Sequence, residues 1–240
     1  MDVNGLRKRV GMVFQKPNPF PMSIYDNIAY GPRTHGIHSK AKLDEIVEKS
    51  LRDAAIWDEV KDRLKKSALG MSGGQQQRVG IARALAVNPE FIVCDEPISA
   101  LDVSIQSQVV NMLEDMQHEM GLTYLFIAHD LSVVRHISHR IGVMYLGTMV
   151  ELAESYELNR HPLHPYTKTL LSAVPVPDPQ VSRSRQRIVL EGDIPSPMNP
   201  PSGCRFHTRC PYATEKCKQV VPTFKEYEKG HWVACHLLEE

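Results

Sequence analysis

The stretch SGGQQQRVGIARALAVNPEFIVCDE, residues 72–96, decides the fold class. Its first half, from Gly73 to about Ala86, is predicted to be a helix that ends before Pro89, because proline cannot continue a helix. Residues 91–94 then form a fully apolar run, which is typical of a buried strand. A helix followed directly by a buried strand indicates an α/β protein with a parallel sheet.

The same alternation continues on both sides of this stretch. The apolar runs and helical spacings predict a strand at 10–14, a helix from Ser39 to about Lys66, a helix around 105–116 ended by Gly121, a strand at 123–128, a hairpin of 141–145 and 148–152 about Gly147, and a helix from Pro165. Parallel strands joined by crossover helices are the simplest arrangement of these segments.

Composition is that of an ordinary globular protein. Of the 240 residues 42% are hydrophobic, and 28 basic side chains balance 28 acidic ones, so neither an unfolded chain nor a surface that coats nucleic acid is indicated. No apolar run approaches the roughly 20 residues that span a bilayer. We therefore expect no nucleic-acid partner, and any membrane role to come through a partner protein.

Two proline-rich stretches divide the chain. Residues 175–179 and 195–201 bracket a basic segment, which predicts an extended linker over 175–203 between a main domain, 1–174, and a small cysteine-bearing region, 204–240. A helical subdomain is expected within the main domain at about 20–75. Arg183, Arg185 and Arg187 in the linker are expected to be solvated rather than bound to lipid or RNA.

Polar side chains follow three of the predicted strands. Asp95 and Glu96 end one strand, Gln15 follows another, and His129 follows a third. Ligands of open α/β sheets bind at the carboxyl ends of the strands. There Asp95 can hold Mg²⁺ and Glu96 can polarise a water molecule. Each residue alone also fits a solvent-facing acid or an ordinary cap, so the combination carries the prediction.

A second candidate site begins the helix of the opening stretch. Ser72, Gly73 and Gly74 offer a hydroxyl, backbone N–H groups and the positive end of a helix dipole, a set that attracts anions, although a glycine-rich turn with a serine cap is the plainer alternative. A phosphate-cradling loop needs Gly-Lys followed by Ser or Thr. None of the 14 glycines is followed by lysine, so phosphate would have to bind without that loop.

In this order and spacing, the pieces closely resemble the ATP-binding subunit of ABC transporters, a P-loop NTPase-like α/β fold. The resemblance rests on Gln15 (Q-loop), Ser72, Gly73, Gly74 and Gln75 (signature), Asp95 (Walker B), Glu96 (catalytic glutamate), Ser99-Ala100-Leu101-Asp102 (D-loop) and His129 (switch histidine). It implies ATP and Mg²⁺ as cofactors, a head-to-tail pair of ATPase subunits, permease subunits in the membrane, and a peripheral place on the cytoplasmic face.

The resemblance also sets expectations for activity. The family places the P-loop upstream of the position where this sequence begins, so we expect an amino-terminally truncated domain with little ATPase activity alone. An alternative is a non-catalytic partner that lends Ser72–Gln75 to an intact subunit. Residues 7–79 resemble the phosphate-importer ATPase, whereas about 80–240 are similar to oligopeptide and dipeptide importer ATPases, which leaves the cargo open between peptide and phosphate.

Four of the five cysteines, Cys204, Cys210, Cys217 and Cys235, crowd the last 40 residues. Four thiolates suffice for a [4Fe–4S] cluster or a tetrahedral zinc, although no CxxC pair is present. Some peptide-importer ATPases carry an iron–sulfur cluster here, so the resemblance puts a metal site on an equal footing with free or oxidised thiols. A third hypothesis is a metal-binding regulatory fragment. The remaining candidate ligands, His207, His231 and His236, are expected to be solvated.

Overall fold

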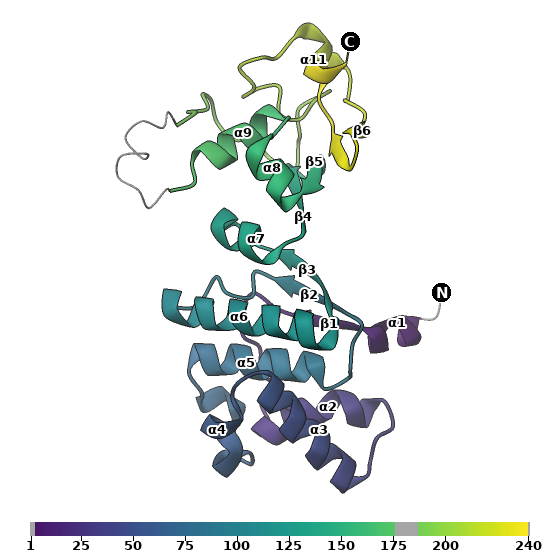
Figure 1. Cartoon of the computed structure of the whole chain (residues 1–240), viewed down its shortest axis with the longest axis vertical. Helices are drawn as coiled ribbons and strands as arrows, with labels where there is room; N and C mark the ends of the chain where they lie inside the picture. Colours follow the sequence, from purple (N-terminus) through teal and green to yellow (C-terminus); the bar gives the residue numbers. More distant parts are fainter. Residues whose placement is uncertain (1–2, 176–186, 240) are drawn as a thin grey trace. The chain divides into compact units, whose positions relative to one another are not determined.

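The computed structural model describes residues 3–175 and 187–239. They divide into two compact units, 1–129 and 130–240, each considered by itself (Figure 1). Arg183 and Arg185 of the predicted linker lie outside the described residues. Among the helices that are described, none has the length and apolar character needed to cross a bilayer.

The first unit is built on the predicted parallel sheet. Its strands are β1 (Val10–Val13), β2 (Phe91–Asp95) and β3 (Thr123–Ile127), in the order β1-β2-β3. The register pairs Gly11 with Ile92, and Cys94 with Phe126, so these positions share one face. All three strands run parallel, which brings their carboxyl ends to one edge of the sheet.

One face of this sheet is packed and the other is open. On the packed face Ile92 and Cys94 are fully buried, and a side chain at Gly11 would come within 3.4 Å of Ala84, so α5 (Gly73–Leu85) lies close against β1. On the opposite face Met12, Leu125 and Ile127 remain 44–50% exposed. A parallel sheet normally has both faces covered, so this face is uncovered apolar surface.

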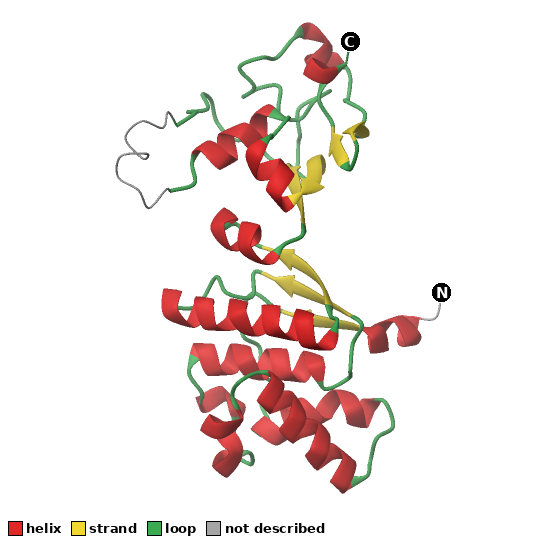
Figure 2. Cartoon of the chain, in the orientation of Figure 1, coloured by secondary structure: helices red, strands yellow, loops and turns green. Residues whose placement is uncertain are grey.

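Helices form the remainder of the first unit (Figure 2). They are α1 (Val3–Arg9), α2 (Ile24–Thr34), α3 (Lys40–Asp53), α4 (Trp57–Val60) and α6 (Val103–Met120), with short 3₁₀ turns at Lys61–Arg63 and Ala68–Gly70. The prediction of one helix from Ser39 to about Lys66 was wrong about where that helix ends, because α3 ends at Asp53. Ala55 has φ +50°, a left-handed conformation that stops α3 and turns the chain before α4.

The second unit contains an antiparallel sheet. The predicted hairpin is present as β4 (Arg140–Tyr145) and β5 (Thr148–Glu154), turning at Leu146 and Gly147, which both have positive φ. Strands β6 (Lys225–Glu228) and β7 (His231–Val233) complete the order β4-β5-β7-β6. The cysteine-bearing region therefore shares a sheet with the hairpin, because β7 pairs with β5.

Short helices and an aromatic cluster complete the second unit. The helices are α7 (Leu131–Ile137), α8 (Ser155–Arg160), α9 (Pro165–Ser172) and α11 (Glu215–Gln219). Phe206 is buried, with ring centroids 5.2 Å from Tyr145, 5.3 Å from Tyr166 and 5.7 Å from His164. Burial lowers the pKa of His164 to about 4, so its imidazole is neutral at pH 7 and its Nδ1 accepts from the Tyr166 N–H.

A buried carboxylate ties β5 to β7 and to the loop before α9. Glu151 is fully buried, and its carboxylate accepts from the backbone N–H groups of Leu163 (2.6 Å) and His164 (3.0 Å). The Nε2 of His231 lies 2.8 Å from the same carboxylate. The Glu151 and His231 side chains are both buried away from water. Their polar atoms therefore need partners within the protein, and each serves as a partner of the other.

Candidate functional site

Three of the predicted site residues meet at the carboxyl edge of the parallel sheet. The Nε2 of Gln15, after β1, donates to one carboxylate oxygen of Glu96 at 2.6 Å. The Nδ1 of His129, after β3, lies 3.2 Å from the other oxygen. Glu96 follows β2, the central strand, so its carboxylate sits between two neighbours that the strand order places on either side.

The backbone at Glu96 is strained. Its φ is +43°, an uncommon conformation for a residue with a side chain, and such strain concentrates at functional sites. The Glu96 N–H donates to the Ile127 carbonyl at 2.9 Å, and the Glu96 carbonyl accepts from Ser99. These bonds hold the turn that carries the Glu96 side chain, which is 25% exposed, whereas His129 is 74% exposed.

Asp95 is the last residue of β2 and is half-buried. Over the described part of the chain its carboxylate has no hydrogen bond or ion pair to another side chain. Carboxylate and amide oxygens are the ligands that Mg²⁺ prefers, and Asp95, Glu96 and Gln15 supply such a set. The donor chemistry at this edge therefore fits Mg²⁺.

The start of α5 is shaped as the sequence predicts. Ser72 caps the helix: its Oγ accepts from the Gln75 N–H at 3.4 Å, and the Gln75 Oε1 accepts from the Ser72 N–H at 3.2 Å. This reciprocal capping box leaves Ser72 and Gly73 exposed, with nothing within 4 Å of the space beside Gly73. The helix dipole adds partial positive charge at this open surface.

Side-chain contacts of Gln75 and Arg78 with Glu59 hold the start of α5 against α4. Gln75 Nε2 donates to Glu59 at 2.7 Å, and the second oxygen of Glu59 pairs with Arg78 at 2.9 Å, which links α5 to α4. No hydrogen bond or ion pair of the described residues joins Ser72–Gln75 to Glu96. Asp102 precedes α6 but makes no capping bond with its side chain. The predicted residues therefore form two separate groups among the described residues: Gln15 and His129 contact Glu96, and Ser72 contacts Gln75.

Gln77 supports the Glu96 group, although no sequence motif singled it out. Its side chain is buried, and its Nε2 donates to the backbone carbonyl of Phe14 at 3.2 Å, immediately before Gln15. A buried amide that bonds the chain at this point holds the Gln15 segment against α5. The signal was present, because Gln77 lies four positions before Ile81 and seven before Ala84, which places it on the same buried face of the helix.

The four carboxyl-terminal cysteines gather around a tight turn. Cys204 donates its N–H to the Cys217 carbonyl at 2.8 Å, and a side chain at Gly203 would lie 2.4 Å from that carbonyl, so only glycine fits there. Burial, together with smaller contributions from Cys204, Cys210 and Cys217, raises the pKa of the Cys235 thiol to about 11. The four sulfurs are thus close enough to influence one another.

Two of the three nearby histidines correct the sequence prediction. His231 is 1% exposed, and the His236 ring is 4% exposed and bonds Glu239 and the Val220 carbonyl, so the prediction that both are solvated was wrong. Their carboxylate partners hold them inside the unit.

A different group, Glu157, His161 and Glu228, brings three ligand atoms within 4.8 Å of one another in the described part of the second unit. All three remain well exposed.

Comparison with known proteins relates the chain to ABC transporters. Residues 2–99 match the family model described as ABC transporter, and residues 150–217 match the one described as oligopeptide/dipeptide transporter, C-terminal region. A solved structure, cbiO1 from Clostridium perfringens, part of the ABC transporter complex cbiONQ, is similar with a TM-score of 0.59 and 27% identity. That likeness covers 66% of this chain and 62% of the other.

Curated relatives are similar over nearly the whole chain. The oligopeptide transport ATP-binding protein AppF of Bacillus subtilis is 53% identical, covering 97% of this chain and 70% of AppF. The oligopeptide transport ATP-binding protein OppF of Haemophilus influenzae is 49% identical, covering 95% of this chain and 69% of OppF. The similarity to AppF thus includes residues that resemble the phosphate-importer ATPase.

Proposed function

Because this chain belongs to the family of ABC transporter ATP-binding proteins for oligopeptides, we propose that it is the ATP-binding subunit of a peptide importer. The observation that carries the proposal is the convergence of Gln15 and His129 on the carboxylate of Glu96. Such a subunit acts with a second ATPase subunit and with permease subunits, at the cytoplasmic face of the membrane.

Each residue of this group has a chemical task in the proposal. Glu96 polarises the water that attacks the terminal phosphate of ATP, and its contacts with Gln15 and His129 orient the carboxylate. His129, exposed beside it, stabilises the terminal phosphate. Asp95 and Gln15 hold Mg²⁺, which neutralises phosphate charge. Ser72–Gln75 present N–H groups and a hydroxyl to ATP bound on the paired subunit.

The 240-residue chain alone is expected to hydrolyse almost no ATP. It contains no Gly-Lys-Ser/Thr triplet, so neither the lysine nor the N–H groups that cradle the β- and γ-phosphates are supplied. The measurement is magnesium-dependent phosphate release by the purified chain, with Glu96→Gln as the matched control. Both proteins should give the same background rate, and turnover that is lost in Glu96→Gln would contradict the prediction.

The exposed, capped start of α5 favours a second candidate function. The chain would act as a non-catalytic partner, presenting Ser72–Gln75 to ATP on a subunit whose own phosphate loop is intact. The capping box uses the N–H groups of Ser72 and Gln75, and the N–H groups of Gly73 and Gly74 in the first helical turn are left for an anion. In that case the partner hydrolyses ATP faster in the presence of this chain.

Peptide is the cargo we propose. Support comes from the 53% identity to an oligopeptide transport protein across 235 residues, which include the helical segment that resembles the phosphate importer. The alternative to a peptide importer is a phosphate-importer ATPase hybrid. It rests only on the resemblance of residues 7–79 to the phosphate-importer ATPase. Uptake of labelled peptide and of labelled phosphate by cells that produce this chain with its permease separates the two.

The clustered thiols support a metal site as part of the same subunit. A tetrahedral zinc with bonds of about 2.3 Å would bring its sulfurs within about 4 Å of one another. The metal site we propose is a [4Fe–4S] cluster held by Cys204, Cys210, Cys217 and Cys235, the group that the family resemblance implies for this region, with zinc as the alternative.

Protein purified without oxygen is expected to contain iron and sulfide in equal amounts and to absorb visible light. Cys210→Ser should remove both the metal and the colour, because it removes one of four thiolate ligands. Cys94→Ala is the matched control, since Cys94 is buried in β2 of the other unit and should keep the iron. Metal-free, colourless protein, or zinc in place of iron, would contradict the cluster.

A further inference from the structure

The second unit brings two carboxylates and an imidazole together at its surface. The Nδ1 of His161 lies 3.4 Å from a carboxylate oxygen of Glu157 and 3.9 Å from one of Glu228. One ligand atom of each residue lies within 4.8 Å of those of the other two. All three residues belong to the second unit, and none of them takes part in the proposed ATP chemistry.

Local structure places two of these side chains together at the end of α8. Glu157 lies on that helix, and His161 follows its last residue, four positions after Glu157, so both side chains are on one face. Pro162 comes next, and a residue before proline avoids the helical conformation, so the helix ends here. The His161 N–H still donates to the Glu157 carbonyl at 2.7 Å. The backbone therefore keeps the carboxylate and the imidazole side by side.

The third side chain comes from a distant part of the sequence. Glu228 ends β6, the edge strand of the antiparallel sheet, and is paired with His231 of β7. The turn between the two strands is held by the Gly230 N–H, which donates to the Glu226 carboxylate at 2.6 Å. All four residues of β6 are exposed. A bond from Glu228 to the end of α8 would therefore give this edge strand a second attachment besides its ladder with β7.

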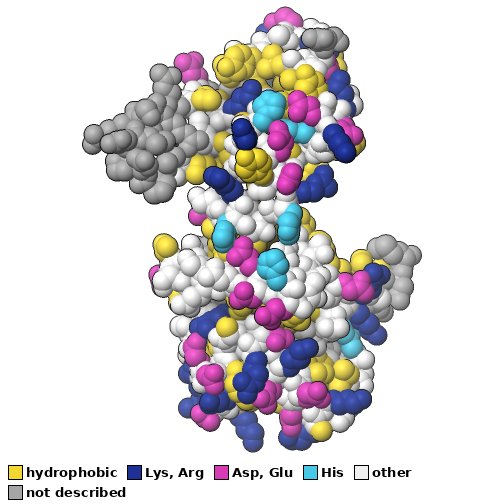
Figure 3. All heavy atoms as spheres, viewed as in Figure 1, with side chains coloured by type: hydrophobic (Ala, Val, Ile, Leu, Met, Phe, Trp, Pro, Cys, Tyr) yellow, Lys and Arg dark blue, Asp and Glu magenta, His cyan; other side chains and the backbone are white. Residues whose placement is uncertain are grey.

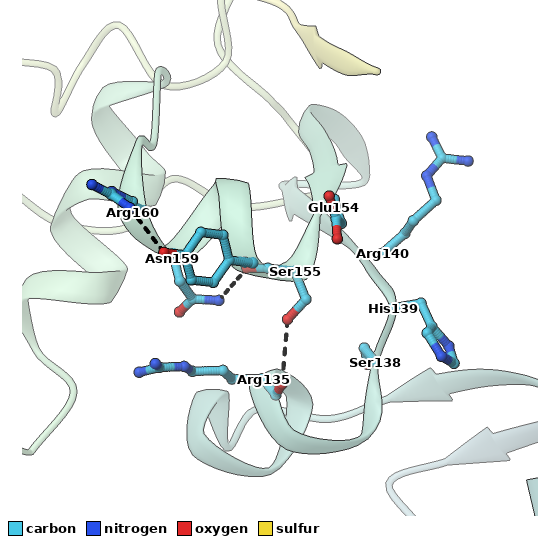
Figure 4. A pocket seen from close by; sticks show the side chains of 9 residues that line it. Arg135, Ser138, His139, Arg140, Glu154, Ser155, Asn159 and Arg160 are labelled. Atoms are coloured by element: carbon cyan, nitrogen blue, oxygen red, sulfur yellow. Dashed lines mark hydrogen bonds between the residues drawn. The ribbon is translucent and has the colours of Figure 1, made fainter. Parts of the chain in front are cut away.

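The group carries more negative charge than its neighbours neutralise. Among the described residues, neither Glu157 nor Glu228 forms an ion pair with a lysine or arginine, and both lie against His161. Arg160 is directed elsewhere: its guanidinium donates to the Tyr156 hydroxyl at 2.8 Å, beside the pocket that α8 helps to line (Figure 4). Two carboxylates this close repel one another. A divalent cation between them would remove that repulsion.

We propose that Glu157, His161 and Glu228 bind one Zn²⁺ ion, which joins α8 to β6. Zinc bonds to nitrogen and oxygen are about 2.0–2.1 Å long, so neighbouring ligand atoms of a tetrahedral ion lie about 3.3 Å apart. The observed separations of 3.4 and 3.9 Å are near that value, and small rotations of exposed side chains close the difference. Three protein ligands leave the fourth position of the ion to water.

The donor set favours zinc over the cations that accompany ATP. Mg²⁺ and Ca²⁺ prefer oxygen ligands, whereas an imidazole with carboxylates suits Zn²⁺ and other divalent transition metals. The edge of the parallel sheet, where Asp95, Glu96 and Gln15 offer oxygens, belongs to the first unit. The zinc site is therefore distinct from the proposed Mg²⁺ site, and the inference does not rest on the proposed ATPase function.

The test is equilibrium dialysis of the full chain against Zn²⁺ near neutral pH, with Mg²⁺ in excess, followed by metal analysis. The four clustered cysteines can also take up zinc, so the site is counted as a difference between variants that all keep them. His161→Gln and Glu228→Gln should each weaken the binding of one zinc per chain at least about tenfold, because each removes one of three ligands. His139→Gln and Glu191→Gln, at an exposed histidine and an exposed glutamate of the same unit, should stay within about twofold.

Hydrogen exchange gives a readout that a purely structural role of these side chains would not change. Zinc should slow amide exchange in β6 of the wild type, because Glu228 becomes bonded to α8, and should have no such effect in His161→Gln. His161→Cys restores a zinc ligand and should recover both the bound zinc and the slower exchange. Circular dichroism without zinc verifies that all variants are folded. The proposal is overturned if His161→Gln and Glu228→Gln bind zinc as the two control variants do, or if bound zinc leaves exchange in β6 unchanged.

Discussion

Replacing Ser72 by arginine is expected to abolish the stimulation that this chain gives to ATP turnover on an intact partner subunit, a fall of at least about 100-fold. In the proposed head-to-tail pair, the exposed start of α5 faces the terminal phosphate held by the partner. The space beside Gly73 is open, so the long side chain introduced by Ser72→Arg would occupy the position where the phosphate must sit. Stimulated phosphate release from the mixed subunits is the measurement.

Glu96→Gln supplies the sharpest control for this experiment. Glu96 belongs to the half of the pair in which this chain's own sequence supplies no Gly-Lys-Ser/Thr loop. Its loss should therefore leave the partner's stimulated turnover unchanged. Ser72→Thr, which keeps a capping hydroxyl, should retain most of the effect. Stimulation that survives Ser72→Arg, or that disappears with Glu96→Gln, would refute the non-catalytic role.

Glu151→Ala is expected to lower the free energy of unfolding of the second unit by about 3–5 kcal/mol. The substitution leaves the N–H groups of Leu163 and His164 buried without their acceptor, and it removes the partner of the buried His231. Each orphaned group costs about 1–3 kcal/mol. The measurement is denaturant unfolding followed by Trp232 fluorescence in a Trp57→Phe background, because the only other tryptophan lies in the first unit.

Glu191→Ala is the matched control for Glu151, since Glu191 is an exposed glutamate of the same unit. That change should alter stability by less than about 0.5 kcal/mol. Glu151→Gln keeps one acceptor oxygen and should fall between the two alanine variants. Equal unfolding curves for Glu151→Ala and Glu191→Ala would show that the buried network contributes nothing to stability.

The site at the sheet edge could be predicted from the sequence because the position of each of its residues depends on neighbouring residues only. Each of Gln15, Glu96 and His129 follows a run of apolar residues, and parallel strands bring their carboxyl ends to one edge whatever lies between them. The hairpin at Gly147 and the end of α6 at Gly121 were predictable for the same reason, since glycine with positive φ marks both. Such signals need no knowledge of distant residues.

The features that the sequence could not predict depend on distant contacts. Glu151 lies in a strand where a glutamate normally faces water, and nothing near it in the sequence names His231 as its partner. The end of α3 was misplaced because Ala55 is a good helix former, and neither its left-handed conformation nor the hydrogen bond that its carbonyl accepts from Arg78 is visible in the neighbouring sequence. The distribution of surface charge, by contrast, could be predicted from composition. Lys, Arg, Asp and Glu are interspersed on the visible face of the first unit, as the balanced composition predicts (Figure 3).

The partners Glu151 and His231 are separated by 80 positions along the chain. While the ribosome is still making the intervening residues, the carboxylate of Glu151 has no imidazole to meet, and β5 lacks its neighbour β7. Closing a loop of that length is slow compared with forming α8 or the β4–β5 hairpin. The second unit therefore completes its core late in synthesis, and until then β5 presents an unpaired edge to the chaperones of the cell.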